Sequence, residues 1–97
     1  MAEIRFHDAA REEYLESYLW YFERGIHIAA TFEHEVDLAL QAILEKPEQW
    51  PVYTGKWRRI LLRRFPFAII YKQADTLITV IAVMHTSRRP GYWKARN

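Results

Sequence analysis

The sequence predicts an α+β fold, a hairpin of two helices packed on a small antiparallel sheet in the order β-α-α-β-β-β. Two features lead to this expectation. Apolar residues recur at helical spacing in the first half of the chain, and β-branched and aromatic residues then concentrate in short runs separated by turn residues. With 97 residues, of which 51% are hydrophobic, the chain can fill one core but not two, so we expect a single domain over residues 1–97.

A short strand and a helix open the chain. Residues 3–7 alternate polar and apolar side chains, which is typical of a strand buried on one face. Asp8 is the expected N-cap of the helix, because its carboxylate can accept hydrogen bonds from the free amides of the first turn. The helix begins near Ala9 and ends at Gly25, and its apolar stripe contains Tyr14, Leu15, Tyr18, Leu19, Tyr21 and Phe22.

A second helix extends from about His27 until Pro47 prevents its continuation. Because the connection at Gly25 is short, the two helices should pack antiparallel as a hairpin. The apolar face of the second helix contains Ile28, Phe32, Val36, Ala39, Leu40 and Ile43. We expect three aromatic residues of the first helix to meet this face in the core: Tyr14, Tyr18 and Phe22.

Three strands follow the helices as an antiparallel meander. Residues 57–64, 67–73 and 76–85 are rich in β-branched and aromatic side chains. The connections between them are short enough for hairpin turns, which make neighbouring strands antiparallel. The last run is almost wholly apolar, as expected of a strand covered on both faces, so we place it centrally in the sheet.

Composition argues against several classes of protein. The absence of cysteine excludes disulfides and thiolate metal sites and suits a reducing cytoplasm. The longest run without a charged residue, Thr76–Ser87, has 12 residues, fewer than the roughly 18 to 20 of a membrane helix. The N-terminus shows no cationic segment followed by an apolar one, so we expect no secretion signal and a cytoplasmic protein without a membrane partner.

Charge is distributed unevenly along the chain. Residues 1–48 contain four Lys/Arg and eleven Asp/Glu, a net charge of −7, whereas residues 49–97 contain ten Lys/Arg and one Asp, a net charge of +9. One interpretation is that acidic helices and basic strands neutralise each other within the fold. The other is that the basic half binds an acidic protein or a nucleic acid.

Motifs for phosphate loops, dinucleotide binding, zinc proteolysis and nucleophile elbows are absent from the sequence. The four histidines do not combine with carboxylates at the spacing of a metal site, so we expect no metal and no cofactor. His27 and His34 share one face of the second helix, where packed or solvated histidines are commoner than ligands.

The expected strand at residues 57–64 is strongly basic. Guanidinium groups bind phosphates and carboxylates through a planar fork of donors, so this strand is a candidate binding surface. Charge that protects an edge strand from aggregation is the alternative. The arginines alternate between the two faces of the strand, with Arg59 and Arg63 on one and Arg58 and Arg64 on the other.

The tail after residue 85 interleaves cations with aromatic residues. Such a tail can bind nucleic acid, because cations neutralise phosphate while aromatic rings stack on bases. The alternative is that Tyr92 and Trp93 fold back as a lid on an uncovered edge of the core. The end of the last strand and the tail should together form the functional surface, built from His85, Arg88 and Arg89 with Arg64 nearby.

Six short motifs accompany this order of elements. They are FHDAA at residues 6–10, KPEQWP at 46–51, RRFPF at 63–67, IYK at 70–72, VMH at 83–85 and RPGYW at 89–93. Together they resemble the RelE/ParE superfamily of toxins from bacterial type II toxin-antitoxin systems. The resemblance covers essentially the whole chain.

The resemblance implies a growth-inhibiting toxin of the plasmid-stabilisation kind, held by a cognate antitoxin as a hetero-oligomer. ParE-like members inhibit DNA gyrase without known chemistry of their own. RelE-like members cleave mRNA on the ribosome, and here their catalytic candidates are His85, Arg64 and Tyr92. That branch typically has an arginine three residues before the strand tyrosine. Since Ala68 stands there before Tyr71, we favour the ParE-like interpretation.

Site residues follow from this preference. Arg88, Arg89 and Lys94 are the candidates for target binding. An acidic, amphipathic antitoxin segment that becomes ordered on binding should dock on the basic half of the chain. A non-toxic interaction protein that keeps the fold is a third possibility. The candidates for antitoxin binding are Arg58, Arg59, Arg63 and Arg64.

Overall fold

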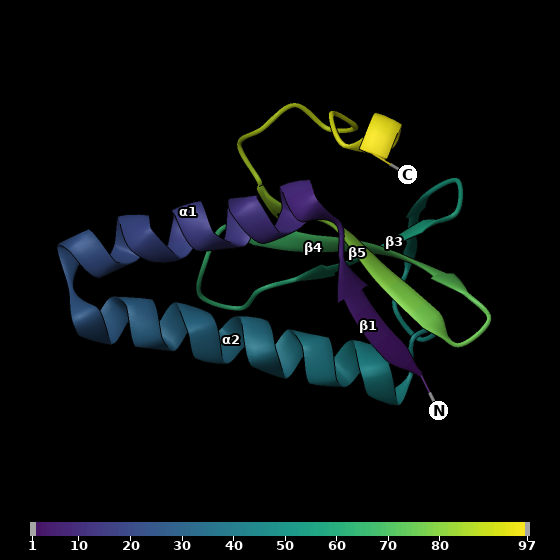
Figure 1. Cartoon of the computed structure of the whole chain (residues 1–97), viewed down its shortest axis with the longest axis horizontal. Helices are drawn as coiled ribbons and strands as arrows, with labels where there is room; N and C mark the ends of the chain where they lie inside the picture. The colour runs from purple at the N-terminus through teal and green to yellow at the C-terminus, as the bar shows by residue number, and fades with distance from the viewer. Residues whose placement is uncertain (1, 97) are drawn as a thin grey trace.

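Two antiparallel helices cover one face of a five-stranded sheet in the computed structural model, which describes residues 2–96 (Figure 1). The helices are α1 (Asp8–Arg24) and α2 (Ile26–Glu45), joined at Gly25, and their joined ends extend beyond the sheet in Figure 1. A short 3₁₀ helix, Lys94–Arg96, lies near the end of the chain. The expected α+β class and helical hairpin are confirmed.

The sheet has the strand order β1-β5-β4-β3-β2. The last three strands of the chain form the expected antiparallel meander, and β5 lies between β1 and β4, so its interior position is confirmed. The strands are β1 (Glu3–Phe6), β2 (Val52–Thr54), β3 (Trp57–Leu61), β4 (Phe67–Ala74) and β5 (Leu77–His85).

Two details of the sheet differ from the expectation. The additional strand β2 lies between Pro51 and Gly55 and has three residues, too few to show a periodic pattern. Strand β1 runs parallel to β5, with Phe6 opposite Val80. No turn connects these two distant strands, so local sequence carries no signal for their relative direction.

The N-cap of α1 is His7, whereas the sequence predicted Asp8, so that prediction is wrong. The imidazole Nδ1 of His7 accepts a hydrogen bond from the Ala9 backbone N–H at 3.1 Å. Asp8 is instead the first helical residue, where its carboxylate lies near the positive end of the helix dipole and 3.5 Å from the Arg11 guanidinium. Either side chain can accept from a free amide, and the backbone path decides which one does.

Phe32 of α2 is the centre of the core between the hairpin and the sheet. It is fully buried, and its ring lies 5.1 Å from those of Tyr21 and Phe67 and 5.8 Å from that of Tyr14. The expected burial of Phe32, Val36 and Ile43 is confirmed.

The prediction for α1 is wrong at its outer side. Phe22 is 47% exposed, and Leu15 and Leu19 are exposed to a similar degree. Apolar residues occupy a wide sector of α1, and the sheet and α2 together can bury only part of that sector. Ile28 of α2 is also exposed. Apolar spacing alone therefore overestimated the buried stripe.

The other face of the sheet is covered by the C-terminal segment, which we define as residues 86–96. Trp93 is fully buried there, with its ring 5.1 Å from that of Trp57 and 6.1 Å from that of Tyr53. Between the two interpretations of the tail, the structure therefore shows the one in which Trp93 folds back on the core. The residues of this second core are Ala68, Ile70, Ile81, Ala82, Met84 and Trp93.

Candidate functional site

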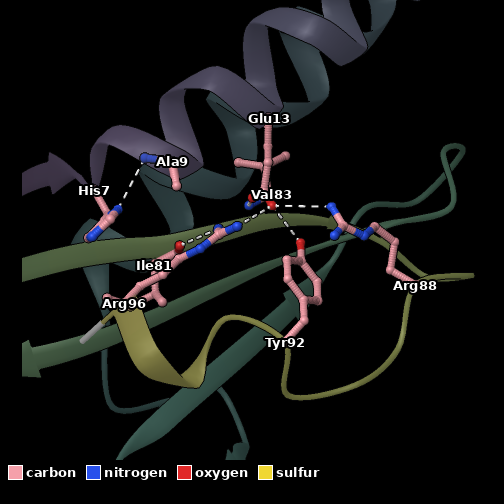
Figure 2. A network of polar contacts seen from close by, with 8 residues as sticks. All are labelled: His7, Ala9, Glu13, Ile81, Val83, Arg88, Tyr92 and Arg96. Atoms are coloured by element: carbon pink, nitrogen blue, oxygen red, sulfur yellow. Dashed lines mark hydrogen bonds and ion pairs between the residues drawn. The ribbon is translucent and has the colours of Figure 1, made fainter.

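Glu13 is the polar centre of the surface between α1, β5 and the C-terminal segment (Figure 2). Its side chain is only 11% exposed. Oε1 accepts a hydrogen bond from the Val83 backbone N–H at 2.9 Å. Oε2 accepts hydrogen bonds from the Tyr92 hydroxyl at 2.6 Å and from the Arg96 guanidinium at 2.9 Å. Both oxygens of this nearly buried carboxylate therefore have donors.

The Tyr92 ring lies between two cations of the segment. The guanidinium carbon of Arg88 lies 3.9 Å from the ring centre and that of Arg96 lies 5.0 Å from it. Arg88 also forms an ion pair with Glu13 at 3.6 Å. Burial, and then the hydrogen bond to Glu13, raise the pKa of the Tyr92 hydroxyl above its usual value. The hydroxyl is therefore protonated at neutral pH, and its proton is donated to the hydrogen bond with Glu13.

A hollow of about 480 Å³ opens beside this network, between α1 and the ends of β4 and β5. Its apolar lining is provided by Trp20, Tyr21, Phe67 and Val83. Its polar lining consists of Glu13, Glu16, Ser17, His85, Ser87 and Arg88. Of the four residues predicted to form the functional surface, the structure brings His85 and Arg88 together at this hollow, whereas Arg89 and Arg64 are not among the lining residues.

His85 is held in place by its neighbours at the end of β5. Its ring packs edge to face on Phe67, with 5.1 Å between ring centres. Its Nδ1 accepts a hydrogen bond from the Ser87 backbone N–H at 3.1 Å and lies 2.7 Å from the Ser87 hydroxyl oxygen. One ring nitrogen is therefore engaged within the chain.

Arg64 lies at a different site, beside α2. Its Nε is 3.1 Å from Oε2 of Glu35, a buried acid, while Oε1 of Glu35 accepts the backbone N–H groups of Arg63 and Arg64 at 3.1 Å each. These bonds hold the turn after β3, which ends at Leu61 and not at residue 64. The prediction of one strand carrying four arginines is therefore wrong for Arg63 and Arg64.

Arg58 and Arg59 do lie on opposite faces of β3, but both are used within the fold. The guanidinium of Arg58 donates a hydrogen bond of 2.6 Å to the Trp50 carbonyl. That of Arg59 lies 4.2 Å from the centre of the Tyr53 ring. Both residues are half-buried, so neither offers a fully free cation to a partner.

A second hollow, of about 310 Å³, lies between α2 and β3. It is largely apolar, and two of its lining residues, Leu38 and Leu61, are about half exposed. The exposed Arg63 and the buried Glu35 are also among its lining residues. We name this surface the α2–β3 groove.

Comparison with known proteins identifies the family. Residues 4–90 match the family model described as the ParE toxin of the type II toxin-antitoxin system parDE. The chain belongs to the ParE toxin family. No curated protein matches the chain. The expected membership of the RelE/ParE superfamily is confirmed.

A solved structure supports the fold of this ParE-family chain. It is described as the chromosomal ParDE TA system from P. aeruginosa, and the two chains superpose with a TM-score of 0.75 at 16% sequence identity. The match covers 88% of this chain and 96% of the other. At this identity the match shows a shared fold. Tyr92, Trp93 and Arg96 lie beyond residue 90 and thus outside the stretch matched by the ParE family model.

Within residues 2–96, the ParE-family chain contains no group of three or more His, Cys, Asp or Glu side chains that could hold a metal ion. Neither α1 nor α2, the two α-helices of this range, contains an apolar stretch that could span a bilayer.

Sequence reasoning did not identify Glu13 and Glu35 as site residues. Each one lies at helical spacing from residues that are buried: Glu13 three residues after Ala10, and Glu35 three residues after Phe32. An acidic residue at such a position on a helix is the signal that could have found both, because a buried carboxylate requires donors. The donors themselves lie far along the chain.

Proposed function

We propose that this ParE-family protein is the toxin of a type II pair, that it arrests growth by binding DNA gyrase, and that a cognate antitoxin neutralises it in a hetero-oligomer. Because gyrase acts in the cytoplasm, the proposal places the protein there. One observation carries the preference for binding over catalysis: two of the three nuclease candidates, Tyr92 and Arg64, are engaged within the chain and lie at different sites.

RNA cleavage by attack of a 2′-hydroxyl needs a base, an acid and a cation around one phosphate. The Tyr92 hydroxyl donates to Glu13, and Arg64 pairs with Glu35 on a different helix. His85 remains beside the hollow, with Nδ1 engaged by Ser87. This arrangement supports a binding surface better than it supports a nuclease.

The C-terminal segment provides the cations of that surface. Arg89 and Lys94 are exposed and have no ion-pair partner among residues 2–96. Arg88 is about half exposed beside the hollow. Cations on a fixed backbone can meet an acidic protein surface with little loss of conformational entropy, which favours specific contact. We assign target binding to Arg88, Arg89 and Lys94.

For the antitoxin we propose the α2–β3 groove. Its exposed Leu38 and Leu61 suit the apolar side chains of an amphipathic segment, and the exposed Arg63 in its lining suits that segment's carboxylates. Arg64 is 74% exposed despite its contact with Glu35, so it can contribute as well. Arg58 and Arg59 have structural contacts instead, and we propose no antitoxin contact for them.

The antitoxin site is tested by measuring the affinity of the cognate antitoxin for two double variants. We expect Arg63→Ser with Arg64→Ser to weaken binding. The affinity of this double variant should also depend less on salt concentration than that of the unaltered protein, because two of the attracting charges are gone. We expect Leu38→Ser with Leu61→Ser to weaken binding at every salt concentration. Unchanged affinity in both double variants would exclude the α2–β3 groove.

The target is tested by adding the purified protein to gyrase supercoiling reactions and, separately, to programmed ribosomes. We expect inhibition of supercoiling, relieved by antitoxin, and intact mRNA on the ribosome. Cleaved mRNA with unaffected supercoiling would support the nuclease. No effect in either reaction would favour a non-toxic interaction protein.

A matched pair of variants separates binding from proton transfer in cells. His85→Gln keeps much of the shape of histidine and its hydrogen bonding but removes proton transfer, which typically contributes about 10² to 10⁴ in rate. We expect growth arrest to survive His85→Gln and to weaken with Arg88→Ala and Arg89→Ala together. Complete loss of toxicity in His85→Gln, with folding and antitoxin binding intact, would contradict the binding mechanism.

A further inference from the structure

We infer that Glu13 is a positioning residue for target binding: its carboxylate on α1 fixes the C-terminal segment to the sheet and so orients Arg89 and Lys94. The inference rests on the proposed function in one respect, that this segment contacts the target. The contacts that fix the segment are those drawn in Figure 2.

The need for such a carboxylate arises where β1 ends. Strand β1 pairs with β5 only as far as Val80, whereas β5 continues to His85. Ile81 has no partner in β4, because the register of β4 with β5 shifts there, with Ile70 opposite Ala82 and Tyr71 opposite Val80. Beyond Val80, backbone groups of β5 therefore lack a strand on the β1 side.

Side chains take the place of the missing strand. Glu13 accepts the hydrogen bond of the Val83 N–H at 2.9 Å, and Arg96 donates to the Ile81 carbonyl at 3.1 Å. Arg96 and Glu13 are themselves joined at 2.9 Å. The ion pair between Glu13 and Arg96 therefore provides hydrogen-bond partners for two backbone groups of β5, the Val83 N–H and the Ile81 carbonyl. A buried backbone group without a partner would cost free energy of folding.

The same carboxylate sets the direction of the segment, which Trp93 alone does not. Burial of the Trp93 ring attaches the segment to the second core, but apolar contact has little directional preference. Hydrogen bonds to Tyr92 and Arg96 are directional, and the ion pair with Arg88 adds a third contact. The exposed cations Arg89 and Lys94 lie between these attached residues in sequence, so their orientation depends on Glu13.

This role goes beyond what family membership implies. Tyr92, Trp93 and Arg96 lie outside residues 4–90, the stretch that matches the family model. The inference therefore rests on the contacts that Glu13 makes with Tyr92 and Arg96 in this chain.

Glu13→Gln tests the inference, because glutamine keeps the length of the side chain and an acceptor for Val83 but loses the charge that binds the two arginines. We expect the hydrogen-bonded amides of the C-terminal segment, those of Arg88, Lys94 and Arg96, to lose protection from hydrogen exchange. The concentration for half-inhibition of gyrase should rise by about tenfold or more. Affinity for the antitoxin should change by less than about twofold, because the α2–β3 groove lies elsewhere on the fold.

The matched control is Glu12→Gln, which removes one carboxylate from the exposed side of the same helix. It should change neither exchange nor inhibition. If Glu13→Gln resembles Glu12→Gln in both measurements, the inference is wrong. Should Glu13→Gln fail to fold, Tyr92→Phe combined with Arg96→Gln removes the two hydrogen bonds to Glu13 from the other side and must show loosening and loss of inhibition in the same direction.

The two readouts separate this inference from the proposed function. If the unaltered protein does not inhibit gyrase, the proposed function fails, and exchange still shows whether Glu13 fixes the segment. If the segment loosens in Glu13→Gln while gyrase inhibition is unchanged, the positioning role is wrong although the proposed function stands.

Discussion

The two faces of the sheet are closed in different ways. The hairpin face is covered by two helices and by a cluster of rings around the fully buried Phe32. The opposite face is covered by a single segment attached through one buried ring, Trp93, and one carboxylate, Glu13. Apolar packing distributes its stabilisation over many contacts, whereas a segment held by few contacts depends on each of them. The difference teaches where mutation should unfold the protein and where it should disturb only a surface.

The largest effect should come from Phe32→Ala on the hairpin face. Removing a fully buried phenylalanine leaves a cavity among Tyr14, Tyr21 and Phe67, so we expect a loss of roughly 3 to 5 kcal/mol in the free energy of unfolding. Denaturation with urea measures it. A loss under about 1 kcal/mol would place this face outside the core.

Trp93→Ala should have a smaller global effect on the opposite face. The C-terminal segment can detach while the rest of the sheet stays folded, which limits the cost to about 2 kcal/mol even though a fully buried ring is lost. Gyrase inhibition should fall and antitoxin affinity should be retained. A loss as large as that of Phe32→Ala, with antitoxin binding lost as well, would show that the two faces fold as one unit.

Glu35 allows a comparison between a buried acceptor and its exposed ion-pair partner, Arg64. Glu35→Ala leaves the backbone N–H groups of Arg63 and Arg64 without their acceptor, so we expect a loss of about 1 to 2 kcal/mol. Arg64→Ala removes only an exposed partner and should cost less than about 1 kcal/mol. Equal losses in the two variants would mean that the ion pair, and not the turn, is what Glu35 stabilises.

Alkaline pH should weaken the fold gradually and through both faces. Burial raises the pKa of Tyr71 to about 12, and burial together with Glu33 and Asp37 raises that of Tyr14 to about 12, while the pKa of Tyr92 is also raised. An unfolded tyrosine titrates near pH 10, so between about pH 10 and about pH 12 the unfolded chain binds fewer protons than the folded one. The free energy of unfolding should therefore fall as pH rises through this window and should be unaffected by these groups below it.

Tyr71→Phe sharpens this pH prediction. The variant lacks one titrating group and the hydrogen bond to the Pro47 carbonyl, so it should be less stable near neutral pH but lose less stability toward about pH 11. Urea denaturation at about pH 9 and about pH 11 measures both effects. An identical decrease in the two proteins would contradict the assignment to Tyr71.

By itself, the sequence determined the order of the main elements, the helical hairpin, the burial of Phe32, Val36 and Ile43, and the resemblance to the RelE/ParE superfamily. Local spacing of apolar residues and turn residues predict these features, because both signals act over a few positions of the chain. It also placed His85 and Arg88 near each other, because His85 ends the last strand and Arg88 follows it closely in the sequence.

Only the tertiary structure decided which charges are paired and which are free. Glu13 meets Tyr92 and Arg96 across about 80 residues, and Glu35 meets Arg64 across 29. The parallel pairing of β1 with β5, the fold-back of Trp93 and the internal contacts of Arg58 and Arg59 likewise join distant parts of the chain. A carboxylate selects its donors by distance and direction in space, and neither quantity is contained in residue type or local spacing.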